Sequence, residues 1–210
     1  MKPIVIITAP AHPYLTQRLQ DKGFEVVLSE TISYDELANN IATATGLVVS
    51  TRIKIDQPLL EKAVTLKWIA RLGSGMELID THFAASKNII CVSSPEGNAG
   101  AVGEHTMALL LNLMNKVSAS FAEVKNGLWI RDANRADALF GKTVGIIGMG
   151  HTGNAFASRL QSFGVQILAH DKYKQETDVK NVQFVDLTTL CANADVVSLH
   201  LPLTPETHHY

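Results

Sequence analysis

Residues 143–153, TVGIIGMGHTG, constrain the fold of this chain more than any other stretch. An apolar run typical of a buried strand leads directly into a GxGxxG pattern, formed by Gly148, Gly150 and Gly153. Apolar residues then recur at helical spacing as far as Gly164, which can end a helix. Because a strand precedes the glycines and a helix follows them, the stretch predicts the strand–turn–helix unit of a dinucleotide-binding domain.

The three glycines are expected to have separate tasks. Gly148 allows the tight turn, Gly150 lets the backbone approach a pyrophosphate, and Gly153 permits close packing of the helix on the strand. The first amides of a helix also bind anions, so His151 and Thr152 are expected beside the diphosphate. The alternative is a tight strand-to-helix turn that binds nothing.

Asp171 ends the next apolar run, 18 residues beyond Gly153. This is close to the position, about 20 residues on, where an acid receives the adenosine ribose hydroxyls. A carboxylate there accepts hydrogen bonds from a 2′-hydroxyl and repels a 2′-phosphate, so the sequence favours NAD over NADP. The neighbouring cations Lys172 and Lys174 leave NADP open as the alternative.

Short apolar runs rich in β-branched residues recur along the chain, each followed by a segment with helical spacing. Strands that crossover helices bury on both faces have this uninterrupted apolar pattern. The alternation predicts an α/β protein with two tandem parallel-sheet domains, divided near residue 98. Asp56 and Asp186 are placed to cap helices, and Ser33 with Glu36 has capping-box spacing. The expected strands cover residues 4–8, 25–28, 47–50, 67–71, 89–92, 143–148, 165–170, 182–185 and 195–201.

Two loops that follow strands of the first domain differ from ordinary connections. Ligands of open parallel sheets gather at the carboxyl ends of the strands. Gly73, Ser74 and Gly75 can expose successive backbone amides and so form an anion nest that would hold a carboxylate. Arg52 can add a charge-assisted contact to an acidic substrate, with a solvated surface arginine as the alternative.

The last apolar run delivers His200, Leu201 and Pro202 to the ligand edge of the second sheet, so they are expected near the cofactor. His200 titrates near neutral pH and could act as a general base. No acid lies nearby in sequence, and a place in the cofactor wall is favoured. Glu104 and His105 are expected at the start of a helix, where a structural hydrogen-bonded pair is favoured over a functional one.

The composition argues against several classes of function. The formal net charge is -2 and no lysine or arginine cluster stands out, so nucleic-acid binding is not expected. No uncharged stretch approaches the roughly 20 residues of a membrane span, and the first apolar run meets prolines too early for a signal peptide. A soluble cytoplasmic protein is expected. Cys91 and Cys191 are expected as reduced core thiols, and His208 with His209 lacks a third metal ligand.

Four separated motifs occur along the chain: RLGSGMELID at 71–80, SSPEGNAGAVGEHT at 93–106, VGIIGMGHTG with Asp171, and ADVVSLHLPLTPET at 194–207. Together they resemble the D-isomer-specific 2-hydroxyacid dehydrogenases, the family that includes D-3-phosphoglycerate dehydrogenase. The resemblance implies a flavodoxin-like substrate domain at 1–98 and an NAD-binding Rossmann domain at 99–210 whose C-terminal part is missing. It also implies a homodimer.

The resemblance extends the set of expected site residues. Ser74 would contact the nicotinamide side and, with Gly75, hold the substrate carboxylate. Leu201 and Pro202 would line the cofactor through their backbone, with Thr207 close by. The expected cofactor contacts are therefore Ser74, Gly148, Gly150, His151, Thr152, Gly153, Asp171, His200, Leu201, Pro202 and Thr207; the expected substrate contacts are Arg52, Ser74 and Gly75.

The sequence departs from the family pattern in two places. Thr152 stands where an aliphatic residue is usual, and Met76 with Glu77 replaces the usual Asp-Asn, which affects the expected substrate preference. The arginine, glutamate and histidine that the family uses in catalysis are expected beyond Tyr210, so no catalytic residue is assigned. The 210 residues are interpreted as a C-terminally truncated chain with negligible turnover of its own.

The intact protein is expected to be an NAD-dependent oxidoreductase that transfers a hydride between nicotinamide and a small D-2-hydroxyacid or 2-oxoacid of the phosphoglycerate or hydroxypyruvate type. A non-catalytic NAD-sensing regulatory protein on the same fold and an NADP-dependent Rossmann enzyme are the alternatives. The helix MALLLNLMNKV at 107–117 is expected to be well buried. Together with the segment around Trp129 it is the candidate dimer surface, with core packing as the alternative.

Overall fold

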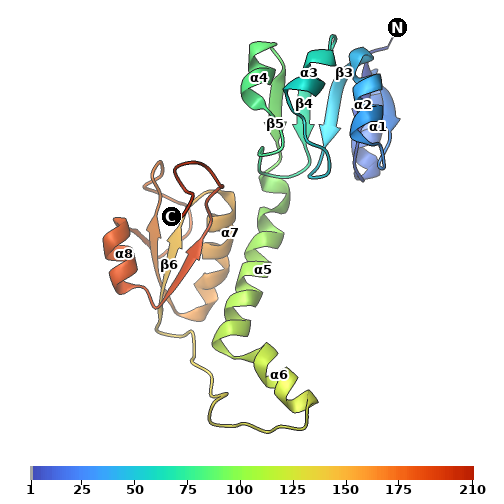
Figure 1. The fold of residues 1–210 in the computed structure, drawn as a ribbon. Helices are drawn as coiled ribbons and strands as arrows, with labels where there is room; N and C mark the ends of the chain where they lie inside the picture. Colours follow the sequence, from blue (N-terminus) through green and yellow to red (C-terminus); the bar gives the residue numbers. More distant parts are fainter. Residues whose placement is uncertain (1) are drawn as a thin grey trace. The chain divides into compact units, whose positions relative to one another are not determined.

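The computed structural model describes residues 2–210. The chain divides between Gly97 and Asn98 into two compact units. Each unit has a parallel sheet of its own with helices between the strands, which confirms the expected α/β class (Figure 1). The division falls beside residue 98, where the domain boundary is expected.

The first unit is a five-stranded parallel sheet with the order β2-β1-β3-β4-β5. This is the doubly wound order of flavodoxin-like folds. The expected strands lie within three residues of those observed. The strands are β1 (Ile4–Ile7), β2 (Glu25–Leu28), β3 (Ala44–Val49), β4 (Trp68–Arg71) and β5 (Ile90–Ser93); the helices are α1 (Pro13–Asp21), α2 (Tyr34–Asn40), the 3-10 turn η1 (Ile41–Thr43), α3 (Gln57–Lys62) and α4 (Thr81–Ser86).

Local signals in the sequence set the helix starts of the first unit. The Ser33 hydroxyl accepts from the Glu36 N–H at 3.2 Å, and the Glu36 carboxylate accepts from the Ser33 N–H at 2.8 Å. This reciprocal capping box begins α2. The Asp56 carboxylate caps α3 by accepting from the Leu59 N–H at 3.4 Å, and Pro58 occupies the first turn. The central strands β1 and β3 are nearly fully buried, as their apolar runs predict, whereas the edge strands β2 and β5 expose Leu28 and Ile90.

The second unit is a four-stranded parallel sheet with the order β8-β7-β6-β9. Numbered from its own first strand, the order is 3-2-1-4, which corresponds to the first four strands of the usual dinucleotide fold. Asp186 caps α8 through the Thr189 N–H at 2.8 Å, as expected. The elements are α5 (Glu96–Met114), α6 (Val117–Lys125), β6 (Thr143–Ile147), α7 (His151–Leu160), the 3-10 turn η2 (Gln161–Phe163), β7 (Gln166–His170), β8 (Val182–Phe184), α8 (Leu187–Asn193) and β9 (Val196–Leu199).

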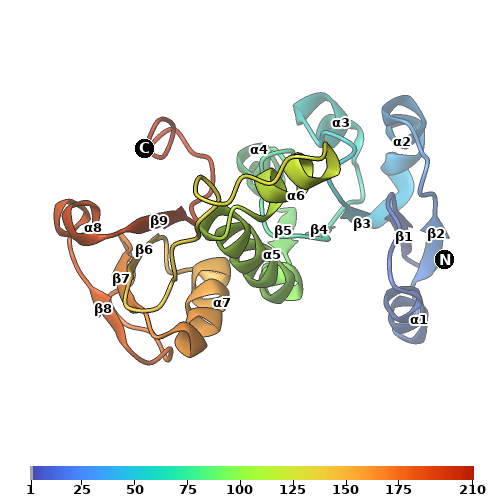
Figure 2. The same cartoon turned by 90° about the horizontal axis from the view of Figure 1, so that it is seen from below.

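Helices cover both faces of this second sheet. Ile146 on β6 packs with Phe156 of α7 and Leu110 of α5, whereas Ile147, the next residue, packs with Leu190 of α8. Figures 1 and 2 show α7 and α8 on opposite sides of the strands. The alternation of side chains along a strand therefore distributes the core into two layers.

Helix α5 corrects two expectations. It begins at Glu96, so Glu104 and His105 lie in its middle and not at a helix start. It is also not well buried: Met107 and Leu110 lie in the core, but Leu109 and Leu113 are 55% and 71% exposed. The sheet and α7 cover only one stripe of the helix, which leaves its other apolar residues outside.

The two cysteines also differ from expectation. Both are free thiols, but Cys191 is exposed and Cys91 is only partly buried. On α8 the inward position belongs to Leu190, which is fully buried. The next residue of a helix turns away from that face, so the apolar neighbours of Cys191 in sequence do not surround it in space.

Candidate functional site

The turn after β6 has the geometry that its glycines predict. Gly148 has φ +95°, and a side chain on it would meet the His200 carbonyl oxygen at 2.5 Å. A side chain on Gly153 would meet the Gly148 carbonyl oxygen at 2.0 Å. A left-handed turn and a close helix-to-turn contact thus require the first and third glycines.

Gly150 is different because open space surrounds it. A side chain there would meet no atom within 4 Å, and its φ is -73°. Gly150 is the N-cap of α7 and makes no side-chain cap hydrogen bond. The first N–H groups of a helix have no acceptor in a preceding turn. Together with the helix dipole, this makes a site that attracts an anion. His151 and Thr152 form the first turn of that helix.

Two cavities meet at Gly150. One, of about 480 Å³, lies between the loops that follow β6, β7 and β9. The other, of about 660 Å³, lies between the start of α7 and the loop after β7. The first is lined by Ile147, Gly148, Gly150, His170, Asp171, Lys172, Tyr173, His200, Leu201, Pro202, Thr204, Glu206, Thr207 and Tyr210; the second by Gly150, His151, Asn154, Tyr173, Lys174, Gln175, Glu176, Thr177 and Asp178.

Asp171 joins the glycine turn to the loop after β7. Its Oδ2 accepts from the Met149 N–H at 2.7 Å, and its Oδ1 accepts from the N–H groups of Tyr173 and Lys174 at 2.8 and 3.0 Å. Partial burial acts to raise the pKa of this carboxyl, but the three amide donors and the charge of Lys174 outweigh it and hold the pKa below its ordinary value. A carboxylate offers about four acceptor positions, so one remains for a ligand hydroxyl.

His200 closes the other side of the glycine turn. Its backbone N–H donates to the Ile147 carbonyl at 2.8 Å. Its ring stacks on the Phe156 ring, with the two centroids 5.5 Å apart. The ring nitrogens lie 3.0 Å from the Ser198 hydroxyl and 3.3 Å from the Thr152 hydroxyl. Burial lowers the pKa of the imidazole, so the neutral form is favoured. Thr152 therefore has a polar partner in the residue that follows the neighbouring strand β9.

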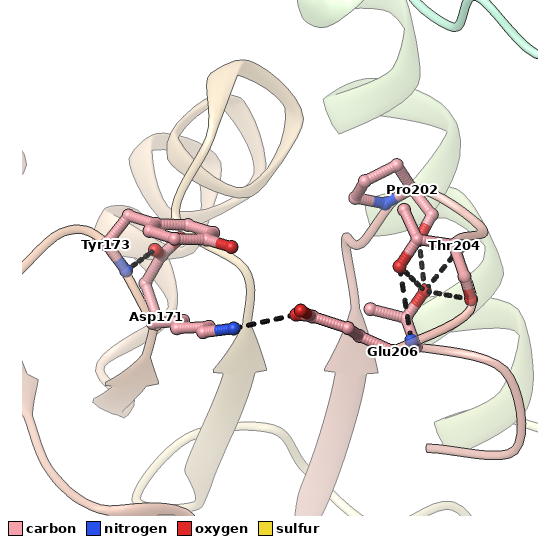
Figure 3. A network of polar contacts seen from close by, with 7 residues as sticks. Asp171, Tyr173, Pro202, Thr204 and Glu206 are labelled. Carbon is pink, nitrogen blue, oxygen red and sulfur yellow. Dashed lines mark hydrogen bonds and ion pairs between the residues drawn. The ribbon is translucent and has the colours of Figure 1, made fainter.

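The loop after β9 is held by its threonines (Figure 3). The Thr204 N–H donates to the Thr207 hydroxyl at 2.8 Å, and the Thr207 N–H donates to the Thr204 hydroxyl at 3.2 Å. The Thr207 hydroxyl also lies 2.5 Å from the Pro202 carbonyl, to which it donates. Thr207 was expected beside the cofactor; it lines the cavity and in addition organises the turn that carries Glu206.

Sequence reasoning missed Asn154. Its side-chain amide donates to the carbonyls of Met149 and Gly150 at 2.6 and 2.9 Å, and its Oδ1 accepts from the Thr177 hydroxyl. The side chain thus ties the glycine turn to the loop after β7. An asparagine in the first turn of a helix is too common a feature to have signalled this contact.

The expected substrate residues lie at the carboxyl ends of β3 and β4 in the first unit. Arg52 donates to the carbonyls of Thr8 and Ile32 at 3.1 and 2.7 Å, so part of its donor capacity is used within the unit. Ser74 is exposed, after Gly73 with φ +140°. A side chain on Gly75 would meet the Glu77 carboxylate at 2.2 Å, so this carboxylate lies against the amide loop.

Other site classes find no support in the described part of the chain. Residues 2–210 contain no group of three or more His, Cys, Asp or Glu side chains that could hold a metal ion. None of the helices in the same range is long and apolar enough to cross a membrane.

The sheet order, the glycine turn and the Asp171 carboxylate define the second unit as a dinucleotide-binding α/β domain. Residues 107–210 match the family model described as "D-isomer specific 2-hydroxyacid dehydrogenase, NAD binding domain".

Relatives extend the similarity to both units. A hydroxypyruvate reductase of Thermotoga maritima is 37% identical over 205 residues, which cover 98% of this chain and 67% of that protein. A D-3-phosphoglycerate dehydrogenase of Methanocaldococcus jannaschii is 36% identical over 208 residues, which cover 98% of this chain and 40% of that protein. Among solved structures, a D-lactate dehydrogenase of Aquifex aeolicus complexed with NAD and lactic acid has a TM-score of 0.82 at 28% identity, covering 98% of this chain and 62% of that one.

The chain belongs to the D-isomer-specific 2-hydroxyacid dehydrogenases, and its second unit is the NAD-binding domain of that family. This confirms the resemblance that its separated motifs indicate. The chain spans 40% of the length of the phosphoglycerate dehydrogenase and 67% of the length of the hydroxypyruvate reductase.

Proposed function

We propose that this protein serves an NAD-dependent oxidation of a small D-2-hydroxyacid, or the reverse reduction of the 2-oxoacid, with the second unit binding the cofactor. The observation that carries the proposal is the open space at Gly150, bounded by the first turn of α7 on one side and by Asp171 on the other. The bound cofactor would accept or donate the hydride. Relatives named for phosphoglycerate and hydroxypyruvate support the substrate class.

Different residues of the second unit bind different parts of the dinucleotide in this proposal. The first amides of α7, at His151 and Thr152, hold the diphosphate. Asp171 accepts from the adenosine ribose with its remaining acceptor position, while its bonds to Met149, Tyr173 and Lys174 fix its orientation. The backbone of Leu201 and Pro202, with His200 and Thr207, forms the wall of the cavity of about 480 Å³.

In the first unit, Ser74 and Gly75 are proposed to hold the substrate carboxylate through backbone amides, with Arg52 as a supporting cation. Arg52 already donates to two carbonyls, so it contributes charge and its remaining donors. The Glu77 carboxylate beside Gly75 must move for a carboxylate to bind there. Glu77→Gln is therefore expected to strengthen binding of a 2-oxoacid.

Calorimetric titration of the 210-residue chain with NAD and with NADP tests cofactor binding. We expect one NAD bound per chain and weaker binding of NADP, because Asp171 repels a 2′-phosphate. Asp171→Ala is expected to weaken the binding of NAD and to narrow the difference in affinity between NAD and NADP. Absence of binding by either dinucleotide would refute the proposal, and tighter binding of NADP would favour the NADP-dependent alternative.

Turnover is a separate question. The arginine, glutamate and histidine expected for catalysis are assigned to no position in residues 1–210, and charge stabilisation and proton transfer each contribute orders of magnitude in rate. The prediction of negligible turnover by these residues alone is tested by NADH-dependent reduction of hydroxypyruvate. A measurable rate would contradict it. NAD binding without turnover by the whole protein would favour the regulatory alternative.

We also propose that the protein forms a homodimer through the apolar surface of α5, α6 and the segment that follows. Leu113, Phe121, Trp129 and Phe140 are 71%, 69%, 83% and 79% exposed. Large exposed apolar patches commonly mark protein interfaces. Sedimentation of the chain should give a dimer, and Leu113→Glu with Phe121→Glu should give a monomer. A monomeric starting protein would refute this proposal.

A further inference from the structure

Lys172 lies where a cation could reverse the preference for NAD. It follows Asp171 directly at the end of β7. In NADP-binding proteins of this fold, a nearby cation accommodates the 2′-phosphate. In this structure, however, the Lys172 ammonium contacts Glu206: its Nζ lies 2.7 Å from the Glu206 Oε2. The ammonium also lies 5.4 Å from the centroid of the Tyr173 ring.

Glu206 reaches the lysine from a different part of the sheet. It belongs to the loop after β9, whereas Lys172 follows β7, and both line the cavity of about 480 Å³. Figure 3 shows Glu206 pointing across the space toward the loop of Asp171 and Tyr173. The mutual hydrogen bonds of Thr204 and Thr207 fix the turn that carries Glu206. The backbone that carries Glu206 is therefore fixed by its own loop, and the contact with Lys172 orients the carboxylate.

Each member of the pair stabilises the ionised form of the other. The hydrogen bond and charge of Glu206 raise the pKa of Lys172, and the same contact with Lys172 lowers the pKa of Glu206. Both groups stay ionised near neutral pH. A ligand phosphate that approaches this end of the cavity meets a lysine whose charge is already matched, and two carboxylates, Asp171 and Glu206.

We propose that Glu206 is a specificity-determining residue for the cofactor, which engages Lys172 in an ion pair and so prevents it from accepting a 2′-phosphate. The inference rests on the proposed dinucleotide site. The 2′-phosphate of NADP can contact the Lys172 ammonium only if the ion pair with Glu206 breaks. The 2′-hydroxyl of NAD needs only a hydrogen bond to Asp171. Because both side chains are more than half exposed, the effect on the affinity ratio is modest, about two- to five-fold.

The test measures dissociation constants of NADH and NADPH for the 210-residue chain and its Glu206→Gln variant at low salt. We expect the ratio of the NADPH constant to the NADH constant to fall about two- to five-fold in the variant. This relative gain in NADPH affinity should vanish when Lys172→Met is added, because the gain depends on the freed Lys172 ammonium. It should also shrink at high salt.

Glu104→Gln is the matched control. It removes the same charge and breaks an ion pair of similar length, 3.1 Å to Arg159, at residues that do not line the cavity. The ratio of the NADPH to the NADH dissociation constant in this variant should equal that of the unmodified chain. An unchanged ratio in Glu206→Gln, an equal change in the control, or a gain that persists without Lys172 would each overturn the inference while NADH still binds. Loss of binding of both dinucleotides by the unmodified chain would instead refute the proposed function, and this inference with it.

Discussion

Gly153 and Gly150 should respond in opposite ways to the same added methyl group. In Gly153→Ala the new Cβ would lie 2.0 Å from the Gly148 carbonyl oxygen, whereas real Cβ contacts are essentially never shorter than 3.0 Å. The obstacle is backbone, so no side-chain rotation relieves it. The backbone of Gly148 cannot shift easily, because its N–H donates to the His170 carbonyl at 2.8 Å and its φ is already +95°.

Relief of this clash requires α7 or the turn to move by roughly 1 Å. Overpacking of a well-packed core costs about 1–3 kcal/mol. A clash between two backbone segments belongs at the upper end, so we expect the free energy of unfolding to fall by about 2–3 kcal/mol. For a chain of this size the melting temperature should fall by roughly 5–10 °C, measured by far-ultraviolet circular dichroism.

Gly150→Ala is the matched comparison. Its Cβ meets no atom within 4 Å, so the cost is limited to the poorer N-cap, at most about 1 kcal/mol. The methyl group would instead enter the space proposed for the diphosphate, and dinucleotide affinity should fall at least about tenfold, since binding depends on close backbone approach. If Gly153→Ala kept the melting temperature of the unmodified chain, or Gly150→Ala kept full affinity, the assignment of these tasks would be wrong.

Three further outcomes are expected. Asp171→Ala should lower the free energy of unfolding at neutral pH by about 1–3 kcal/mol. Since the folded pKa of Asp171 is lowered, this difference is fully present above the unfolded pKa of about 3.9 and should shrink in urea titrations as the pH falls through the folded value; a difference that grew in acid would contradict the cause assigned. His200 has a lowered folded pKa, so the stability of the unmodified chain relative to His200→Gln should be constant at high pH and decrease as the pH falls through about 6.5, where the unfolded chain takes up the proton first; a pH-independent difference would show that burial does not disfavour the charged ring. In α5, Gly103→Ala should destabilise by about 1–3 kcal/mol because its Cβ would lie 2.8 Å from the Ala155 backbone, whereas Gly100→Ala, whose nearest neighbour is the Arg159 guanidinium at 3.7 Å, should stabilise by about 0.5–1 kcal/mol; equal melting temperatures would refute the close packing of α5 on α7.

The strands were predictable because their apolar runs are long and continuous. The expected run that differs most does so for a local reason. The strand β3 begins at Ala44, before the expected start at 47, because small residues at 44–46 give no apolar signal. The glycine turn was predictable for a stricter reason: only glycine tolerates the φ of Gly148 or the contact at Gly153.

Other features depend on contacts that sequence patterns do not report. Helix α5 begins at Glu96 in the stretch EGNAG, whose glycines disfavour helix. Further along the same helix, Gly103 packs closely against Ala155 of α7, a tertiary contact that propensity does not report. The contacts Thr152–His200 and Lys172–Glu206 join residues 48 and 34 positions apart. Each pair joins segments that follow different strands and that only the strand order brings together, so no local pattern predicts it.

A dinucleotide is proposed to lie between the first turn of α7 and the Asp171 carboxylate. The most direct measurement is the change in backbone amide chemical shifts of the isotope-labelled chain during titration with NADH. We predict that the amides of Gly150, His151, Thr152 and Lys172 shift together and saturate at one ligand per chain. Saturation without shifts in the glycine turn, or shifts confined to residues 2–97, would contradict the account.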